Sequence, residues 1–584
     1  MKIKISDLLT SKISKVTDCV FSGQGGFVIH IMDSFNKLKK IKIVPGQSEQ
    51  GCSLAADAYT RASGKLGIVV TTSGPGMLNS LQGLACSHYD SIPALYIIGA
   101  PVTAGLRKNK NLRQLGFQEM EVKEIVKSFT KYATRVTDPN MLSYEIDKAI
   151  HIARSGRPGP CLIDLPDDIQ RAEVLIKNQK IYKIKKNKKN LNKLNTSFKK
   201  AVNLIKKSKK PIFIIGNGAK ISNTINDIKK IIKKFQIPYS PTWASFDCFS
   251  ANDKLNIGSF GVYASRYGNF SIQNSDLLVI LGSRLSAPLT GGNPKFFAPN
   301  AKKILIDIDS YELREENKIP INLKINTDLK NFVDYLKKEK NLWTVNRPWI
   351  QAINNLKTKY PLVDKEYNKQ KKFVNPYIFF QELSKCTKNN DIIIPDASAN
   401  LVWAYQSYQV SKKQKMFTSL NHSPMGYSVA ASIGASLGSP KSNIIAIIGD
   451  GSMPMNVQEL ENIKSLNLPI KVFILNNKGY GMIKQTIDTW MKSVYVGCDP
   501  ASGLSLPDSL KIANSYGIKG VKIVNQKNIK NKIMKILKIK GPVICDVQLN
   551  PNQQIIPKVK SGRPLYDMLP ALDEEEIQSN IDIL

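Results

Sequence analysis

Short apolar runs of five to seven residues recur along the chain and alternate with longer stretches that carry apolar residues at helical spacing. A buried strand between helices gives this pattern, and strand–helix alternation is typical of a doubly wound parallel sheet. A helical stretch at 52–63 precedes the first clear pair of runs. The runs that we expect to form strands are 67–72, 94–99, 211–216, 277–282, 303–309, 391–395, 444–448, 471–475 and 543–547.

These runs fall into three blocks, which we interpret as domains. The expected domains are 1–175, 195–340 and 372–550, followed by a tail at 551–584. A lysine-rich stretch at 178–210 is interpreted as the linker between the first two blocks. The predicted fold class is therefore α/β, with three doubly wound parallel-sheet domains. No internal repeat is visible, although the first and third blocks could share a fold without sequence similarity.

Composition excludes several classes of protein. With 584 residues, 42% of them hydrophobic and 22% charged, the chain is close to the globular average. No stretch of eighteen apolar residues occurs, and the opening MKIKISDLLTSKISKVTD is too polar for a signal peptide. The eight cysteines are scattered without metal-binding spacing, which suits a reducing compartment. We expect a cytoplasmic protein without a membrane span.

The net charge of +38 raises the question of nucleic-acid binding. Only 12 of the 84 basic residues are arginine, and the other 72 are lysines in helical and linker stretches. Base readers and phosphate clamps favour arginine for its bidentate fork. We therefore interpret the charge mainly as solvated helix faces and expect no nucleic-acid partner. A basic nucleic-acid surface and attraction of anionic ligands are the alternatives.

The strongest chemical pattern follows two successive apolar runs of the third block. The first run leads into Gly449-Asp450-Gly451-Ser452, and the next ends at a segment that contains Asn477 and Gly479. Asp450 and Asn477 are 27 residues apart, about one strand–helix–strand unit, so both are expected at the carboxyl ends of neighbouring parallel strands. A carboxylate, an amide oxygen and the Gly479 carbonyl suit Mg²⁺. Gly449 and Gly451 allow close approach of a diphosphate, to which Ser452 donates.

This pattern resembles the signature of thiamine diphosphate enzymes. Further pieces, in order along nearly the whole chain, are similar to the acetolactate synthase large-subunit family. They are QSEQGCSLAADAYTRASGK, FQE at 117–119, RPGPCLIDLPDDIQ at 157–170, MGYSVAASIGA at 425–435 and NVQELENIKSLNLPIKVFILNNKGYGM. The resemblance implies the fold of that enzyme type, with a pyrimidine-binding, a central and a diphosphate-binding domain.

The resemblance also implies roles for individual residues. Glu49 would hydrogen-bond the cofactor's pyrimidine, Met425 would be the apolar wedge that folds the cofactor, and Gln118 would face the substrate. His422 would contact the substrate or donate a proton, with a structural hydrogen-bonded histidine as the alternative. Ser398-Ala399-Asn400 stand where the family usually has Gly-Gln-His. The other expected cofactor-binding residues are Gly25, Gly26, Ser423, Gly481 and Met482.

In this family the central domain holds FAD in a structural role. The matching residues are Gly216, Gly218 and Arg284. A second family arginine is replaced here by Pro288, and a neighbouring acid by Ser286. The resemblance therefore implies FAD, while these replacements leave open whether the flavin is retained.

The resulting hypothesis is an acetolactate synthase-like carboligase. It would decarboxylate pyruvate and transfer the two-carbon unit to a second 2-keto acid. At the acceptor site, Asp167 and Thr486 replace a family lysine and a family tryptophan. These replacements favour, as the alternative, a related carboligase that uses a keto sugar or another carbonyl acceptor in surface polysaccharide biosynthesis.

The resemblance implies a homodimer or homotetramer with active sites at the subunit interface, and a small regulatory subunit is a further expectation. A nucleic-acid-binding or scaffold protein on a decayed fold is disfavoured because Glu49, Asp450 and Asn477 are intact.

Overall fold

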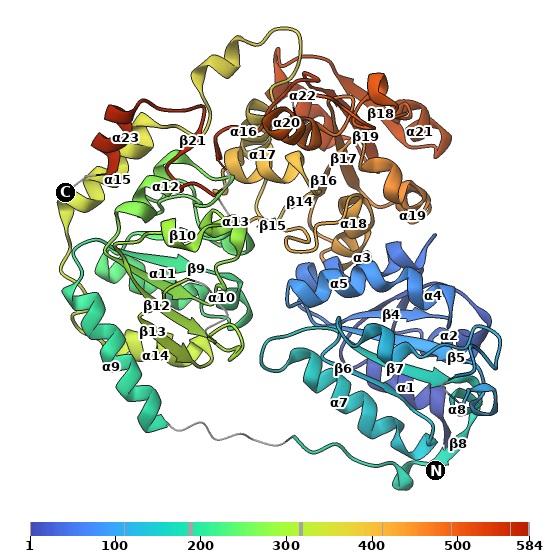
Figure 1. Cartoon of the computed structure of the whole chain (residues 1–584). Coiled ribbons are helices and arrows are strands. Elements are labelled where there is room, and N and C mark those ends of the chain that lie inside the picture. The colour runs from blue at the N-terminus through green and yellow to red at the C-terminus, as the bar shows by residue number, and fades with distance from the viewer. Residues whose placement is uncertain are drawn as a thin grey trace.

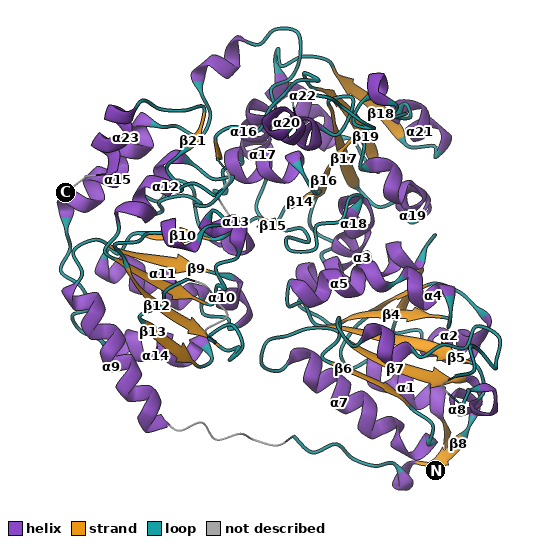
Figure 2. Ribbon diagram, in the orientation of Figure 1, coloured by secondary structure: helices purple, strands orange, loops and turns teal. Residues whose placement is uncertain are grey.

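The computed structural model describes residues 2–109, 111–184, 191–314, 319–411, 413–491, 493–560 and 562–581. Within these residues the chain forms three parallel-sheet units (Figures 1 and 2), with sheets of six, five and six strands. The predicted α/β fold class is confirmed. Each expected apolar run forms a strand within about two residues of its expected limits.

The N-terminal unit has a six-stranded sheet in the order β3-β2-β4-β5-β7-β6, and all of its strand pairs are parallel. Its strands are β2 (Cys19–Ser22), β3 (Lys42–Pro45), β4 (Gly67–Thr71), β5 (Ala94–Ala100), β6 (Tyr132–Arg135) and β7 (Cys161–Pro166). Its helices are α1 (Ile5–Ile13), α2 (Ile29–Leu38), α3 (Glu49–Ser63), α4 (Pro75–Asn79), α5 (Leu81–Tyr89), α6 (Val122–Val126), α7 (Leu142–Arg154) and α8 (Asp167–Arg171). Two short strands, β1 (Lys2–Lys4) and β8 (Glu173–Leu175), pair antiparallel beside it.

The central unit has a five-stranded parallel sheet in the order β10-β9-β11-β12-β13. Its strands are β9 (Pro211–Ile215), β10 (Tyr239–Pro241), β11 (Leu277–Leu281), β12 (Lys302–Asp307) and β13 (Leu323–Asn326). Its helices are α9 (Leu191–Lys207), α10 (Asn217–Ile221), α11 (Ile225–Phe235), α12 (Arg266–Asn274), α13 (Ala287–Thr290), α14 (Leu329–Lys338) and α15 (Arg347–Lys359).

The expectation that 178–210 is a linker is wrong for its second half, which forms α9. Phe198, Val202 and Ile205 follow helical spacing and are buried in the core of the central unit. Lysine and asparagine occupy eight of the seventeen positions of this helix, so its apolar stripe is easily overlooked. Residues 185–190 of the stretch lie outside the described residues.

The C-terminal unit has a six-stranded parallel sheet in the order β15-β14-β16-β17-β19-β18. Its strands are β14 (Ile392–Pro395), β15 (Lys415–Met416), β16 (Ile444–Gly449), β17 (Ile470–Asn476), β18 (Lys519–Ile523) and β19 (Val543–Gln548). Its helices are α16 (Pro376–Cys386), α17 (Ala399–Ser407), α18 (Tyr427–Gly438), α19 (Leu460–Ser465), α20 (Gly481–Trp490), α21 (Ser509–Ser515) and α22 (Ile529–Lys538).

The N-terminal and C-terminal units share one topology. Numbered within each unit, both sheets run 2-1-3-4-6-5. Their helices α3 and α18 pack against each other between the two sheets (Figure 1), and buried residues of both units form a single hydrophobic cluster. The two units are therefore paired copies of one fold without a visible sequence repeat.

The described residues of the C-terminal tail return to the central unit. Val559, Leu565 and Met568, from β20 (Lys558–Val559), β21 (Met568–Leu569) and the turn between them, are buried in its core. Helix α23 (Glu574–Ile581) lies beside α12 and α15 (Figure 1). Among the described residues, no helix combines the length and apolar character that a membrane span requires.

Candidate functional site

Asp450 and Asn477 lie at the carboxyl ends of adjacent parallel strands, as the sequence predicts. Strands β16 and β17 are paired, with Gly449 opposite Leu475. The buried Asp450 carboxylate accepts the backbone N–H of Gly451 at 3.0 Å and that of Gly479 at 3.2 Å. The two turns are thereby held together around one carboxylate.

The Asn477 side chain completes a cluster that fits a cation. One terminal atom of its amide lies 2.9 Å from the Gly479 carbonyl oxygen and 3.3 Å from Asp450 Oδ1. As a nitrogen this atom would donate to both oxygens. As an oxygen it would complete a set of three oxygens facing one another, which suits a hard cation. Burial raises the pKa of Asp450 to about 7 despite the backbone N–H groups, so a cation would favour the charged carboxylate.

The expected diphosphate-binding segments lie where the strand order reverses. Ser398, Ala399 and Asn400 follow β14, and Ser452 follows β16 at the N-terminal end of the next helical segment. Ligands of open α/β sheets bind at such a switch point. Ser398 has φ 68° and ψ −140°, a backbone conformation that favours glycine.

Gly481 and Met482 begin α20, which starts four residues after Asn477. Because α20 is the first helix after β17, the expected cofactor residues of this unit all lie at one edge of its sheet.

The Met425 turn is held by a buried acid that the sequence analysis did not single out. Asp396 accepts the N–H groups of Gly426 at 3.1 Å and Ser428 at 2.9 Å. These bonds fix the start of α18, and Met425 is half-buried just before it. Asp396 follows β14 directly, so the Met425 turn also lies at the carboxyl edge of this sheet.

His422 and Ser423 occupy the loop that leads into this turn. His422 is exposed, and its ring stacks on that of Tyr89, with ring centres 5.9 Å apart. Ser423 is half-buried with φ 52°. Since Tyr89 ends α5, His422 contacts the N-terminal unit of its own chain.

Glu49 and Gln118 lie together at the carboxyl edge of the N-terminal sheet. Glu49 is the first residue of α3 and accepts a hydrogen bond from Asn79 Nδ2 at 3.0 Å. The Gln118 carbonyl accepts the Ser73 hydroxyl at 2.7 Å, and Gln118 has φ 58°. The segment 73–79 after β4 thus supports both residues.

The expected Gly25 and Gly26 lie in the turn after β2, at the same edge. In the described part of the chain, no hydrogen bond or ion pair joins Glu49 or Gln118 to Asp450 or Asn477. The structure therefore places the expected cofactor residues at the carboxyl edges of two sheets, one in each of the paired units. We call these the two cofactor-type edges.

The two residues that replace family residues at the expected acceptor site, Asp167 and Thr486, both bond to neighbours in their own chain. Asp167 lies 3.6 Å from His30 Nε2 and 3.3 Å from Arg171 Nε, so its negative charge is countered locally. Thr486 is exposed on α20 and donates to the Met482 carbonyl at 2.9 Å.

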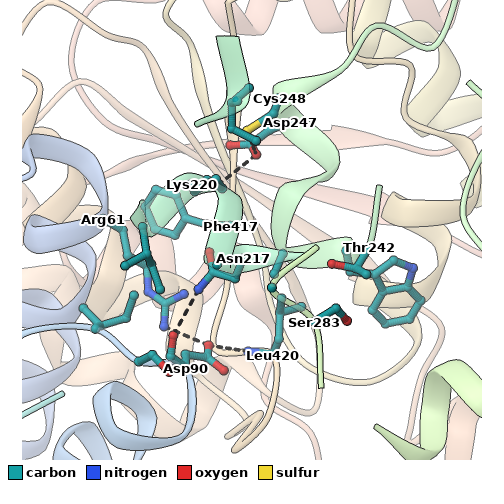
Figure 3. A pocket seen from close by; sticks show the side chains of 18 of the residues that line it. Arg61, Asp90, Asn217, Lys220, Thr242, Asp247, Cys248, Ser283, Phe417 and Leu420 are labelled. Carbon is teal, nitrogen blue, oxygen red and sulfur yellow. Dashed lines mark hydrogen bonds and ion pairs between the residues drawn. The ribbon is translucent and has the colours of Figure 1, made fainter. Parts of the chain in front are cut away.

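A cavity of about 1360 Å³ lies where the three units meet (Figure 3). The central sheet runs 2-1-3-4-5, and the cavity opens at its switch point, beyond β9 and β11. Gly218 and Arg284 line it, and Arg284 also donates to Asn421. Gly216 does not line the cavity, and a Cβ there would overlap the Gly282 backbone. It serves close packing of the two strand ends instead.

The cavity carries polar groups from all three units. Arg61 of α3 pairs with Asp90 at 2.8 Å, and Lys220 of α10 pairs with Asp247 at 2.9 Å (Figure 3). Two buried donors in the wall, Trp243 Nε1 and Tyr405 Oη, have no hydrogen-bond partner among the described residues. Their rings stack with centres 4.9 Å apart.

Comparison with known families agrees with this architecture. Three family models match in order: the N-terminal TPP binding domain of thiamine pyrophosphate enzymes at 4–125, their central domain at 198–336 and their C-terminal TPP binding domain at 396–547. TPP is thiamine pyrophosphate, the same compound as thiamine diphosphate. Fold and matches together define a three-domain thiamine diphosphate enzyme.

Individual relatives narrow this class. Acetolactate synthase 1, chloroplastic, of Nicotiana tabacum is 32% identical over 579 residues, covering 97% of this chain and 85% of the relative. The acetolactate synthase large subunit of Cyanidium caldarium is 31% identical, with 94% of each chain covered. That of Lactococcus lactis subsp. lactis is 29% identical, with 94% of this chain and 93% of the relative covered. The chain therefore belongs to the acetolactate synthase family of thiamine diphosphate-dependent enzymes.

Proposed function

We propose that the protein decarboxylates pyruvate and transfers the two-carbon unit to a second 2-keto acid, forming acetolactate when that acceptor is pyruvate. The observation that carries this proposal is the set of oxygen atoms from Asp450, Asn477 and Gly479 at the ends of two adjacent strands of the C-terminal unit. The N-terminal unit has the same topology and carries Glu49 at the equivalent edge of its sheet. The relatives are named acetolactate synthases, and they do not favour the keto-sugar alternative.

The test is to incubate the protein with pyruvate, Mg²⁺ and thiamine diphosphate and to measure CO₂ and acetolactate. The proposal predicts both products in a 1:1 ratio, dependent on both cofactors. Release of CO₂ without acetolactate would indicate another acceptor, and absence of both products would contradict the proposal.

Mg²⁺ would be held by Asp450, Asn477 and the Gly479 carbonyl. It would link the protein to the diphosphate, which Ser398–Asn400 and Gly449–Ser452 contact from two sides of the switch point. Asp450→Ala should abolish tight, Mg²⁺-dependent binding of thiamine diphosphate without unfolding the protein, as measured by fluorescence titration and circular dichroism. Unchanged affinity would contradict this assignment.

When bound, thiamine diphosphate supplies a nucleophilic carbon and a sink for the electrons released on decarboxylation. In this proposal Glu49 would hydrogen-bond a pyrimidine nitrogen of the cofactor, and the Met425 side chain would pack against the cofactor. Gln118 and His422 would contact the substrate from the loops that carry them. The bond from Asn79 would hold the Glu49 side chain, and the bond from the Ser73 hydroxyl would hold the backbone of Gln118.

The three-unit cavity fits FAD in a structural role. It lies at the switch point of the central sheet and exceeds the usual volume of a small-ligand pocket. Arg284 and the ion pairs Arg61–Asp90 and Lys220–Asp247 line it. Purified protein should show flavin absorbance, and denaturation should release FAD. A colourless protein that binds no added FAD would contradict this.

Two groups of exposed apolar residues support assembly into a homodimer or homotetramer. They gather near the two cofactor-type edges, in the loop before Gln118 and along and after α20. They are Leu112, Leu115, Phe117, Ile483, Trp490, Met491, Val494 and Val496, and Phe117 is 78% exposed. A second copy would cover such surfaces, and in the proposed assembly Glu49 of one chain faces Asp450 of the other.

A further inference from the structure

Glu459 is a buried acid that the proposed mechanism does not use. It ends a short helical segment of the C-terminal unit, η8 (Met453–Glu459), which follows the Gly449–Ser452 turn. Its Oε1 accepts the Ser48 backbone N–H at 3.0 Å and the Ser48 hydroxyl at 3.1 Å, and its Oε2 accepts Asn462 Nδ2 at 2.9 Å. An acid of one unit thus binds the residue immediately before Glu49 in the other.

Ser48 fixes the start of α3. It is the N-cap residue, and its hydroxyl oxygen accepts the Gly51 N–H at 2.9 Å. A Cβ at Gly51 would overlap the Glu459 carboxylate, so glycine lets this acid approach the first helical turn. The positive end of the helix dipole and the donors of Ser48 both favour a carboxylate here. Glu49, the first residue of α3, takes its direction from this cap.

The same segment also contacts the Met425 turn. Asn456 Nδ2 donates to the Gly426 carbonyl at 3.2 Å, and Gln50 Nε2 donates to Asn456 Oδ1 at 3.4 Å. Gln458 Nε2 donates to the Ser48 hydroxyl oxygen at 3.2 Å. Residues 456–459 therefore touch both the turn before α18 and the start of α3.

We propose that Glu459 is a positioning residue for Glu49. By binding Ser48 it sets the start of α3 against the C-terminal unit, so that the Glu49 carboxylate is aimed at the cofactor's pyrimidine. This inference rests on the proposed role of Glu49. It assigns no proton transfer to Glu459 itself.

The experiment compares Glu459→Ala and Glu459→Gln with Glu461→Gln, a matched control at an exposed acid two residues away. Two quantities are measured on each folded holoenzyme. One is the affinity for thiamine diphosphate with Mg²⁺, from fluorescence titration. The other is the rate of hydrogen–deuterium exchange at the reactive carbon of the bound cofactor, from quenched NMR samples.

We expect Glu459→Ala to slow the exchange at least tenfold while cofactor affinity changes less than threefold, because the diphosphate contacts remain. Glu459→Gln keeps one acceptor for Ser48 and should slow exchange by threefold to tenfold, which keeps the test valid if the alanine variant does not fold. Glu461→Gln should match the unmodified protein. Exchange within twofold of normal in Glu459→Gln, or equal losses of exchange and affinity, would overturn the proposal. If Glu49→Gln leaves exchange unchanged, the proposed role of Glu49 fails instead.

Discussion

At the scale of single residues, Ser398 illustrates how this chain departs from its family. It occupies a backbone conformation that favours glycine, and such a conformation costs a residue with a side chain on the order of 1–3 kcal/mol. Its neighbours Ala399 and Asn400 are buried, so the segment is supported by packing. The sequence alone could flag the replacement but not the strain.

Ser398→Gly should therefore stabilise the protein by about 1 kcal/mol, since relief of strain outweighs the greater freedom of glycine in the unfolded chain. The measurement is the melting temperature of the cofactor-free protein. Ser398→Ala is the control, because it removes the hydroxyl and keeps the strain. Equal effects of the two substitutions would contradict the strain argument.

Thr486 bears on the choice of acceptor. We propose that it stands where the family has a tryptophan that favours 2-ketobutyrate. Loss of that aromatic wall would remove apolar contact, and such contact discriminates one methylene by roughly 1–3 kcal/mol. The unmodified protein should thus show little preference for 2-ketobutyrate over pyruvate. Thr486→Trp should raise that preference roughly tenfold, measured as the ratio of the two acetohydroxy acids in a competition assay. A strong preference in the unmodified protein would show that this interpretation of the pocket is wrong.

The sequence correctly predicted that Asp450 and Asn477 lie at the ends of adjacent strands, because a polar motif follows an apolar run at a fixed spacing in both cases. It failed for Glu459 and Asp396, since an acid in a helical or turn segment gives no sign that another unit will bury it. Arg61 and Lys220 were missed for the same reason. Their partners in the cavity come from parts of the chain far apart in sequence.

At the scale of elements, the predicted strands are the buried ones. Edge strands such as β6, β13 and β18 were not recognised, because exposed and polar residues break their apolar runs. Strand β7 lies inside its sheet, but Asp164 interrupts its sequence pattern. Helix starts depend even more on distant contacts, as the anchoring of α18 by Asp396 demonstrates.

That anchor makes a prediction about pH. Burial raises the pKa of Asp396 to about 6 from the ordinary value of 3.8, despite its two backbone hydrogen bonds. Between these values the folded state binds the proton more tightly than the unfolded state, so this residue's contribution to stability is full below pH 3.8 and declines as the pH rises to about 6. The asparagine in Asp396→Asn does not titrate, so this variant should not lose stability in that range. The melting temperature of the variant, compared with that of the unmodified protein without cofactor, should therefore rise from about pH 4 to about pH 7. The corresponding change in the free energy of unfolding is roughly 1–3 kcal/mol. A difference that is independent of pH would contradict the assignment.

At the scale of the whole molecule, two units of one topology face each other through α3 and α18, and the central unit closes a cavity against both. Sequence patterns predicted the number and class of these units. The pairing itself could not be predicted, because it depends on the shared core of two sheets more than two hundred residues apart along the chain. It leaves each cofactor-type edge with half of the expected groups.

The central claim is that Glu49 and Asp450 are two halves of one cofactor site. The most direct test mixes Glu49→Gln and Asp450→Ala chains, each inactive alone, dissociates and reassembles them, and measures acetolactate formation from pyruvate. If the site is shared between two copies, random reassembly should restore about a quarter of the active sites. Absence of recovery after confirmed subunit exchange would contradict the account.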